Sequence, residues 1–150
     1  MAALVVFVDQ LSKALVITNF EPGKLSPIIG DLIQFNLVFN DSAAFSIGFG
    51  ATTVFAVISS VAALIFLWLS SKVETKSWAI LLGVALGGVV GNLVDRLTRE
   101  PGFGRGWVVD FIQIPFNFPV FNLADTAIFI VAVITVIRVM RGDKIGKAKN

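Results

Sequence analysis

The sequence predicts an all-α membrane protein with four transmembrane helices, a small β-structure and an interfacial loop on its outer face. Two observations lead to this prediction. Apolar residues make up 56% of the 150 residues and charged residues only 15%, whereas soluble domains contain about 25% charged residues. Four apolar segments also approach the ~20 residues that a helix needs to cross a bilayer. We expect one integral membrane domain over residues 1–150, with spans at about 1–18, 51–70, 78–97 and 120–140.

The first segment is marginal as a span because it already carries two charges, Asp9 and Lys13. They are spaced i, i+4 with the acid first, which is the favourable order for an ion pair on a helix. This spacing predicts a structural pair. Because only eight residues precede Asp9, we expect the natural helix to begin upstream. The basic region that opens a cleaved signal peptide is missing.

Charge asymmetry sets the expected orientation. The short loop between spans two and three holds Lys72 and Lys76, and the tail after span four is basic. The positive-inside rule assigns both to the cytoplasm. The two long connections then lie outside, so function is expected on the outer face.

The two outer connections differ in pattern. The segment "LIQFNLVFN" (residues 32–40) alternates between apolar and polar residues, which predicts a half-buried strand. "EPGKLSP" before it predicts a turn. The second connection, residues 98–119, is rich in Gly, Pro and aromatic residues, which favours a loop at the membrane interface, where Trp and other aromatic side chains are stable.

The third span combines small and polar residues. Gly83, Gly87 and Gly91 have the spacing of a close helix–helix contact. Asn92 and Arg96 share a face at the outer end of the span. Asn92 suits a packing hydrogen bond, whereas Arg96 needs an acidic or carbonyl partner at that depth.

Several kinds of chemistry are excluded by composition. The chain has no Cys and no His, which removes Cys-His and Ser-His nucleophile pairs and zinc sites built on imidazole. A net charge of +2 gives no reason to expect nucleic acid. We expect neither a metal nor a cofactor.

Four acids lie in or near the spans: Asp9, Asp95, Asp110 and Asp125. An Asp at a helix centre costs roughly 2.5–3.5 kcal/mol, so such acids mark function by default. Asp125 opens span four, and Asp110 lies in the loop before it. Pro115 and Pro119 let that loop double back, so the two carboxylates can meet. Two such carboxylates share one proton and can activate a water.

Ordinary interpretations of the same residues stay open at this point. Asp125 is also what a helix N-terminus favours through its dipole, and Asp110 is also a plausible solvated loop acid. A different functional class is a small transporter or channel subunit whose acids relay protons. That hypothesis requires polar sites at several depths, whereas the acids of spans three and four gather at one end.

Five motifs together resemble a known family. "VDQLSK", "FNDSAAFS", "GGVVGNLVDR", "VVDFI" and "FNLAD" occur in this order over nearly the whole chain. Singly each is weak, but in this order they resemble the bacterial lipoprotein signal peptidases (signal peptidase II). These are four-helix membrane aspartyl proteases that cut the signal peptide from diacylglyceryl-modified prolipoproteins.

The resemblance implies a role for each matching residue. It places the catalytic pair at Asp110 and Asp125. It also implies support of the site or of the substrate by Asn40, Asn92, Arg96 and Asn122, and a more structural role for Asp9, Lys13 and Asp95. It further implies a monomer in the bacterial cytoplasmic membrane, with the active site at the outer face and with lipid-modified prolipoproteins and membrane lipid as partners.

The chain departs from the family at two positions. The family usually has Gly where this chain has Ser42, and often a basic residue where it has Phe39. Glycine permits a positive φ or a close backbone approach, so Ser42 affects the geometry of that loop rather than the acidic pair.

Overall fold

The computed structural model describes residues 1–41 and 51–146. Its four helices are α1 (Ala2–Asn19), α2 (Ala51–Ser70), α3 (Lys76–Thr98) and α4 (Leu123–Met140). All four are long and apolar enough to cross a membrane. Each lies within three residues of the predicted span at either end, and the largest difference is at α4, which begins at Leu123 rather than at residue 120. The expected four-helix membrane fold is confirmed.

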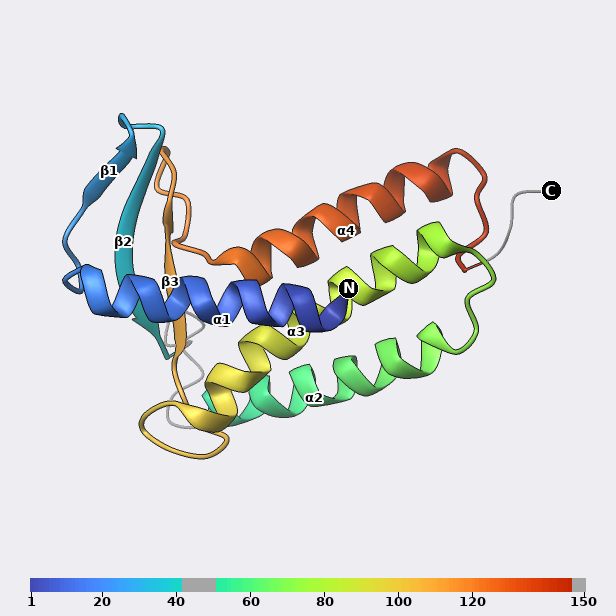
Figure 1. Cartoon of the computed structure of the whole chain (residues 1–150), viewed down its shortest axis with the longest axis horizontal. Helices are drawn as coiled ribbons and strands as arrows, with labels where there is room; N and C mark the ends of the chain where they lie inside the picture. Colours follow the sequence, from blue (N-terminus) through green and yellow to red (C-terminus); the bar gives the residue numbers. More distant parts are fainter. Residues whose placement is uncertain (42–50, 147–150) are drawn as a thin grey trace.

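Helix α3 is the centre of the bundle, because α1, α2 and α4 all pack against it (Figure 1). Its glycines explain the close approach. A Cβ added to Gly87 would lie 2.5 Å from Val5 of α1, and one added to Gly91 would lie 2.7 Å from the Asp9 carboxylate. Gly88, which the sequence analysis did not single out, makes room for α4, where a Cβ would meet the Ala124 carbonyl at 2.6 Å. The small-residue spacing is therefore a packing feature.

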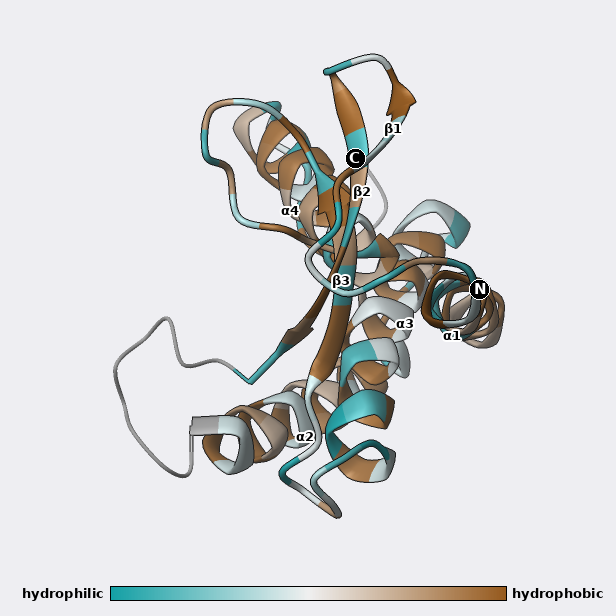
Figure 2. Ribbon diagram, turned by 90° about the vertical axis from the view of Figure 1, so that its left-hand side faces the viewer, coloured by the Kyte–Doolittle hydropathy of each residue, from teal (hydrophilic) through white to brown (hydrophobic). Residues whose placement is uncertain are grey.

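A three-stranded antiparallel sheet lies across one end of the bundle (Figures 1 and 2). Its strands are β1 (Ser26–Ile29), β2 (Ile33–Asn40) and β3 (Val108–Gln113), in the order β1-β2-β3. The predicted strand at β2 is confirmed. The turn predicted for residues 21–27 is wrong at its end, because Ser26 and Pro27 pair with Phe35 and Gln34.

Strand β3 corrects a second expectation, since the sequence analysis placed residues 98–119 in a loop. Val108–Gln113 instead pairs with β2, with Val38 opposite Asp110 and Phe39 opposite Val109. Burial explains why the pairing is stable. Val109 and Phe111 are fully buried with Leu37 of β2 and Val16 of α1. This core fastens the sheet to the C-terminal end of α1.

Candidate active site

The Asp110 carboxylate lies on the face of β3 opposite that core and is only 3% exposed. Its Oδ2 accepts a hydrogen bond from the Asn40 amide at 2.7 Å, and its Oδ1 accepts one from the Asn122 amide at 2.6 Å. Antiparallel pairing of Asn40 with Val108 brings Asn40 beside Asp110 on one face of the sheet. The interpretation of Asp110 as a solvated loop acid is therefore wrong.

Asp125 lies in the first turn of α4, where a capping box fixes its geometry. The Asn122 side-chain oxygen accepts from the Asp125 N–H at 3.0 Å, and the Asp125 Oδ2 accepts from the Asn122 N–H at 3.2 Å. This pattern satisfies N–H groups that have no partner within the helix. The other carboxylate oxygen, Oδ1, accepts from the Asn92 amide at 2.7 Å. The ordinary capping role is thus real, and it leaves Oδ1 directed into the protein.

Asn122 joins the two acids. Because its Oδ1 is used by the helix cap, its Nδ2 must face the other way, toward Asp110 Oδ1 at 2.6 Å and Asn92 Oδ1 at 3.1 Å. Asn92 then has its oxygen toward Asn122 and its amide nitrogen toward Asp125. The orientation of both amides follows from the cap, so every oxygen of the two carboxylates accepts at least one N–H donor.

A buried ion cluster supports these amides from behind. The Lys13 ammonium is fully buried and uses its three donors on Asp9 (2.9 Å), Asp95 (2.7 Å) and the Asn92 oxygen (3.0 Å). The predicted Asp9–Lys13 pair is confirmed in geometry. Because an ammonium group only donates hydrogen bonds, it must face the oxygen of the Asn92 amide rather than its nitrogen. Lys13 therefore also fixes the orientation of Asn92.

The two acids of this cluster tie further elements to it. Asp9 Oδ1 accepts from the Ala124 N–H at 3.0 Å, which caps the start of α4 from α1. Asp95 Oδ2 accepts from the Val109 N–H at 3.2 Å, which anchors β3 to α3. The elements that carry Asp110 and Asp125 are thereby held to the same buried lysine.

Two contributors were missed by the sequence analysis. The Gln10 amide donates to Asp9, Asp95 and the Gly91 carbonyl. Arg99 of the same region of the chain pairs with Asp95 at 2.6 Å. The i, i+4 spacing of Asp95 and Arg99 on α3 is a signal that could have identified this pair.

Arg96 lies close to the acidic pair and retains unused donors. One guanidinium nitrogen donates to the Asn92 carbonyl at 3.3 Å, which is the carbonyl partner expected at this depth. The guanidinium carbon lies 5.7 Å from the Phe55 ring centre. Within residues 1–41 and 51–146, the Arg96 Nε is buried and has no hydrogen-bond partner.

The electrostatics make Asp110 easier to protonate than an ordinary aspartic acid. Burial and the nearby Asp125 charge together raise the pKa of the Asp110 carboxyl to about 6, although the hydrogen bonds from Asn40 and Asn122 act in the opposite direction. Counted in their usual states, four acids face three cations in this cluster: Asp9, Asp95, Asp110 and Asp125 against Lys13, Arg96 and Arg99. One bound proton makes the cluster neutral.

Of the two family departures, only Phe39 lies in the described part. Ser42 falls outside it. Phe39 neighbours Asn40 on β2 and faces the opposite side of the sheet, where it lines a groove of about 490 Å3 with Ile17, Thr98, Arg99, Glu100 and Trp107. Neither Asp110 nor Asp125 lines this groove, so the Phe39 side chain faces away from the acids.

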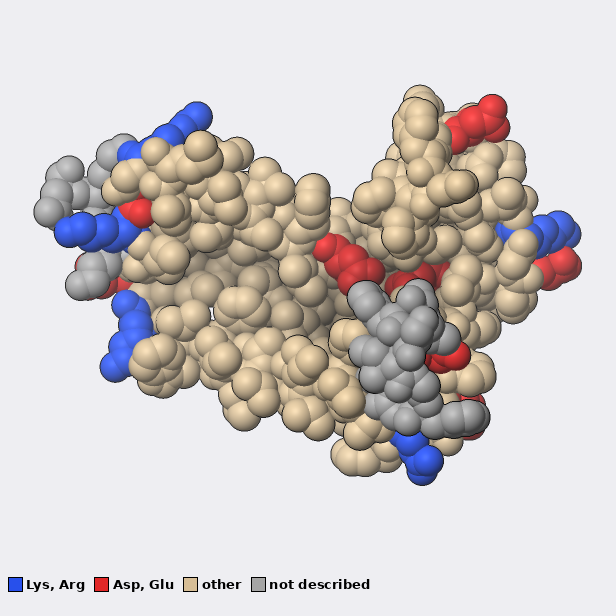
Figure 3. Space-filling view, turned by 180° about the vertical axis from the view of Figure 1, so that it is seen from behind, with Lys and Arg blue, Asp and Glu red and all other residues tan. Residues whose placement is uncertain are grey.

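The four acids of the site differ in their exposure to solvent. Figure 3 shows acidic side chains in the hollow between the helical part and the sheet part. Asp125 is partly exposed, whereas Asp9 and Asp95 are completely buried. The arrangement thus has a partly exposed Asp125 in front, with the buried Asp110 near it, and a closed ion cluster behind.

Comparison with known proteins agrees with the motifs. The model of signal peptidase II matches residues 1–141. A lipoprotein signal peptidase of Leifsonia xyli is 46% identical over 127 residues, covering 85% of this chain and 59% of that protein. One of Mycobacterium avium is 39% identical over 152 aligned positions, covering 99% and 83%. The chain thus spans less than two thirds of the Leifsonia relative.

Solved structures agree as well. A bacterial membrane enzyme solved at 2.3 Å superposes with a TM-score of 0.82 and 25% identity, covering 99% of this chain and 90% of that one. A second, solved at 1.9 Å, has a TM-score of 0.78 and covers 95% of this chain. Motifs, geometry and relatives agree, and the chain belongs to the signal peptidase II family.

Proposed function

We propose that this chain is an aspartic endopeptidase that removes the signal peptide from lipid-modified prolipoproteins at the outer boundary of the bacterial cytoplasmic membrane. The observation that carries the proposal is the convergence of Asp110 and Asp125 on the single side chain of Asn122. The family to which the chain belongs supports the proposed substrate class, since the matched relatives are lipoprotein signal peptidases.

In the proposed mechanism the acidic pair holds one proton and one water. The ionised carboxylate takes a proton from the water as its oxygen attacks the scissile carbonyl carbon, and the carboxylic acid gives its proton to the carbonyl oxygen. When the resulting gem-diol collapses, a proton passes to the leaving nitrogen and the C–N bond breaks. General acid–base catalysis of this kind contributes about 10²–10⁴-fold in rate.

The neighbouring polar residues take different parts in this mechanism. Asn40, Asn92 and Asn122 hold the carboxylate oxygens through their amides. Arg96, with its unpartnered Nε, is suited to hold a substrate carbonyl. Lys13, Asp9 and Asp95 form the buried ion cluster that holds β3 and the start of α4 against α1 and α3. All these groups come from one chain, so we propose that the enzyme acts as a monomer.

A proton-relay transporter has no specific observation in its favour. In the described chain the buried polar and charged residues are Asp9, Lys13, Asn92, Asp95, Asp110 and Asn122. All of them belong to the connected cluster at the sheet end. A relay across the membrane needs further sites toward the other end of the helices.

Cleavage of a lipid-modified precursor by the purified protein in detergent tests the activity. Mobility on a gel reports the loss of the signal peptide. We expect cleavage that depends on the diacylglyceryl group of the substrate. Equal cleavage of lipidated and unlipidated precursor at matched concentration would exclude the substrate class while leaving the aspartic protease mechanism in place.

Single cysteines test the orientation, because the chain has none of its own. Phe103→Cys, in the outer connection, should react with an impermeant thiol reagent in whole cells. Glu74→Cys, in the loop between α2 and α3, should remain unlabelled. The opposite labelling would place the acidic pair on the cytoplasmic side.

A further inference from the structure

The segment between the two acids contains an exposed aromatic turn. Residues 111–124 include no charged side chain. Within them, residues 114–119 ("IPFNFP") form what we call the phenylalanine turn. Phe116 is 99% exposed and Phe118 is 52% exposed. Phe116 has the largest exposed fraction among the large apolar side chains of the described chain.

The backbone holds Phe116 outward. Phe116 and Asn117 have φ values of 70° and 54°, which are unfavourable for a bulky residue and persist only where the surrounding structure requires them. Pro115 and Pro119 restrict the chain on either side. The base of the turn is closed by paired hydrogen bonds between Ile112 and Phe121, at 2.8 and 3.0 Å. The exposure is therefore a property of an ordered turn.

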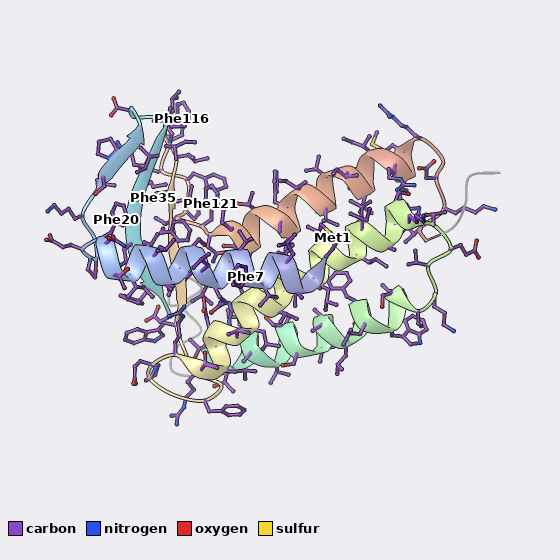
Figure 4. The ribbon with its side chains drawn as sticks, in the orientation of Figure 1. Met1, Phe7, Phe20, Phe35, Phe116 and Phe121 are labelled. Carbon is purple, nitrogen blue, oxygen red and sulfur yellow. The ribbon has the colours of Figure 1, made fainter. Side chains whose placement is uncertain are left out.

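The turn projects sideways from the sheet end of the molecule. It leads directly into α4, a helix long and apolar enough to cross a membrane, on which Phe129 and Ile130 are exposed. Figure 2, seen along the helices from the sheet end, shows the connection between β3 and α4 extending past α4. Figure 4 shows Phe116 at the far tip of this region, well away from Phe20 and Phe35 in the sheet core. Phe118 packs edge-on against Phe121 at 5.8 Å between ring centres.

We propose that the phenylalanine turn inserts Phe116 and Phe118 among the acyl chains of the outer leaflet and so anchors the connection between Asp110 and Asp125 at a fixed depth. Apolar surface that continues from a membrane-spanning helix and carries no charge fits lipid rather than water. The inference goes beyond the proposed function and does not depend on cleavage.

A second outer loop provides a matched comparison. Phe103 is also strongly exposed, at 83%. It lies among charged neighbours, however: Arg99, Glu100 and Arg105. Charged groups stay at the headgroups or in water. Two phenylalanines of similar exposure should therefore lie at different depths.

Depth-dependent quenching tests the proposal. Phe116→Cys and Phe103→Cys each carry the only thiol in the chain, so each accepts one environment-sensitive fluorophore. The labelled proteins are placed in phosphatidylcholine–phosphatidylglycerol vesicles that contain lipids with a nitroxide on the acyl chain. We expect a blue-shifted emission at position 116, quenched several-fold more strongly than that at position 103. Equal quenching at both positions would overturn the proposal.

The same vesicles separate lipid from a second copy of the chain. Quenching at position 116 should stay constant when the lipid-to-protein ratio is raised tenfold. A blue shift that disappears on dilution, with no quenching by nitroxide lipid, would assign the turn to a protein–protein contact and overturn the proposal.

The functional consequence is tested with Phe116→Ser. In vesicles we expect a raised KM for lipidated precursor with little change in kcat, whereas in detergent both should match the unchanged protein. An equal loss in vesicles and in detergent would mean that Phe116 acts through the fold, which would contradict the proposal. Failure of all cleavage would instead concern the proposed function, and the quenching result would still decide the depth of the turn.

Discussion

The two ends of the helical bundle differ in how deeply they bury a cation and in how its charge is balanced. At the sheet end, Lys13 is fully buried and is bound by two carboxylates and an amide. At the opposite end, Arg138 lies 4.1 Å above the Trp78 ring, donates to Asp143 at 2.8 Å, and remains partly exposed. A partly solvated ion pair contributes little, whereas a buried cation without its partners is strongly destabilising. A fully buried cation with its charged partners is found at the sheet end, where the proposed active site lies.

The sheet end is itself divided. Asp9 and Asp95 are completely buried and bound to Lys13, while Asp110 and Asp125 have amide partners in place of a direct cation. Acids neutralised by an ion pair have no proton to transfer. Acids held only by neutral donors in a buried site can share one. This difference separates Asp9 and Asp95, which hold the elements together, from Asp110 and Asp125, which carry the proposed chemistry.

The largest effect is expected when the amide-held acids lose their charge. Asp110→Asn and Asp125→Asn should each lower turnover of lipidated precursor by at least about 10³-fold, because the two acids work as a unit. Asn keeps the shape of Asp but cannot transfer the proton. Steady-state cleavage in detergent measures the loss. A variant that retains half the rate would show that its acid is not needed.

A change in the buried ion cluster of Lys13, Asp9 and Asp95 should lower the stability of the protein. Lys13→Met leaves the buried Asp9 without a cation and Asp95 with Arg99 alone, and it should cost about 3–5 kcal/mol in the free energy of unfolding. Lys24→Met is the matched control, since Lys24 pairs with Glu21 at 3.2 Å on the surface. That pair is worth only about 0–1 kcal/mol. Denaturation in detergent compares the two, and equal losses would remove the distinction between buried and exposed pairs.

How much of this division the sequence could predict depends on the residue. Asp125 was placed correctly in the first turn of α4, because an apolar run of helical length follows it. The Asp9–Lys13 pair followed from local spacing. Asp110 was assigned to a loop, because "VVDFIQ" is short and lies between Gly- and Pro-rich segments, and only its pairing with β2 makes it a strand.

Contacts between distant segments were beyond the sequence. The cap that Asp9 places on Ala124 joins residues 115 positions apart. Nothing local to either residue indicates it. The same holds for the contacts of Asn122 with Asn92 on α3 and Asp110 on β3, whereas its cap with Asp125 is local. Periodicity identifies the faces of elements but not which faces meet.

The pH dependence sharpens the contrast at Asp110. Its pKa is raised to about 6, so the proton is retained below that pH and lost as the pH rises through it. We expect kcat/KM of the free enzyme to fall on the alkaline side of about pH 6. Asn40→Ala removes a hydrogen bond that favours the ionised Asp110 and should move this limb to higher pH.

Asn36→Ala serves as the control for that shift. Asn36 is also on β2, but its amide donates to Gln113 rather than to Asp110. Its pH–rate profile should match that of the unchanged protein. An identical shift in both variants would mean that the effect comes from the strand rather than from the hydrogen bond to Asp110.

The smallest effect is expected at the opposite end of the bundle. Arg138→Ala removes a cation–π contact and a partly exposed ion pair, each worth about 0.5–1 kcal/mol. The melting temperature should fall slightly, and kcat/KM for lipidated precursor should not change. A large loss of activity would mean that the two ends are coupled.

The most direct test compares two Asp→Asn changes within the same buried cluster. Single-turnover cleavage of lipidated precursor and thermal unfolding are measured for Asp125→Asn and Asp9→Asn in parallel. Asp125→Asn should unfold near the temperature of the unchanged protein and cleave at least about 10³-fold more slowly. Asp9→Asn should unfold at a lower temperature, because Lys13 loses a partner, and should still cleave. Near-normal cleavage by Asp125→Asn would contradict the central claim that Asp110 and Asp125 carry out the reaction while Asp9, Asp95 and Lys13 hold the structure.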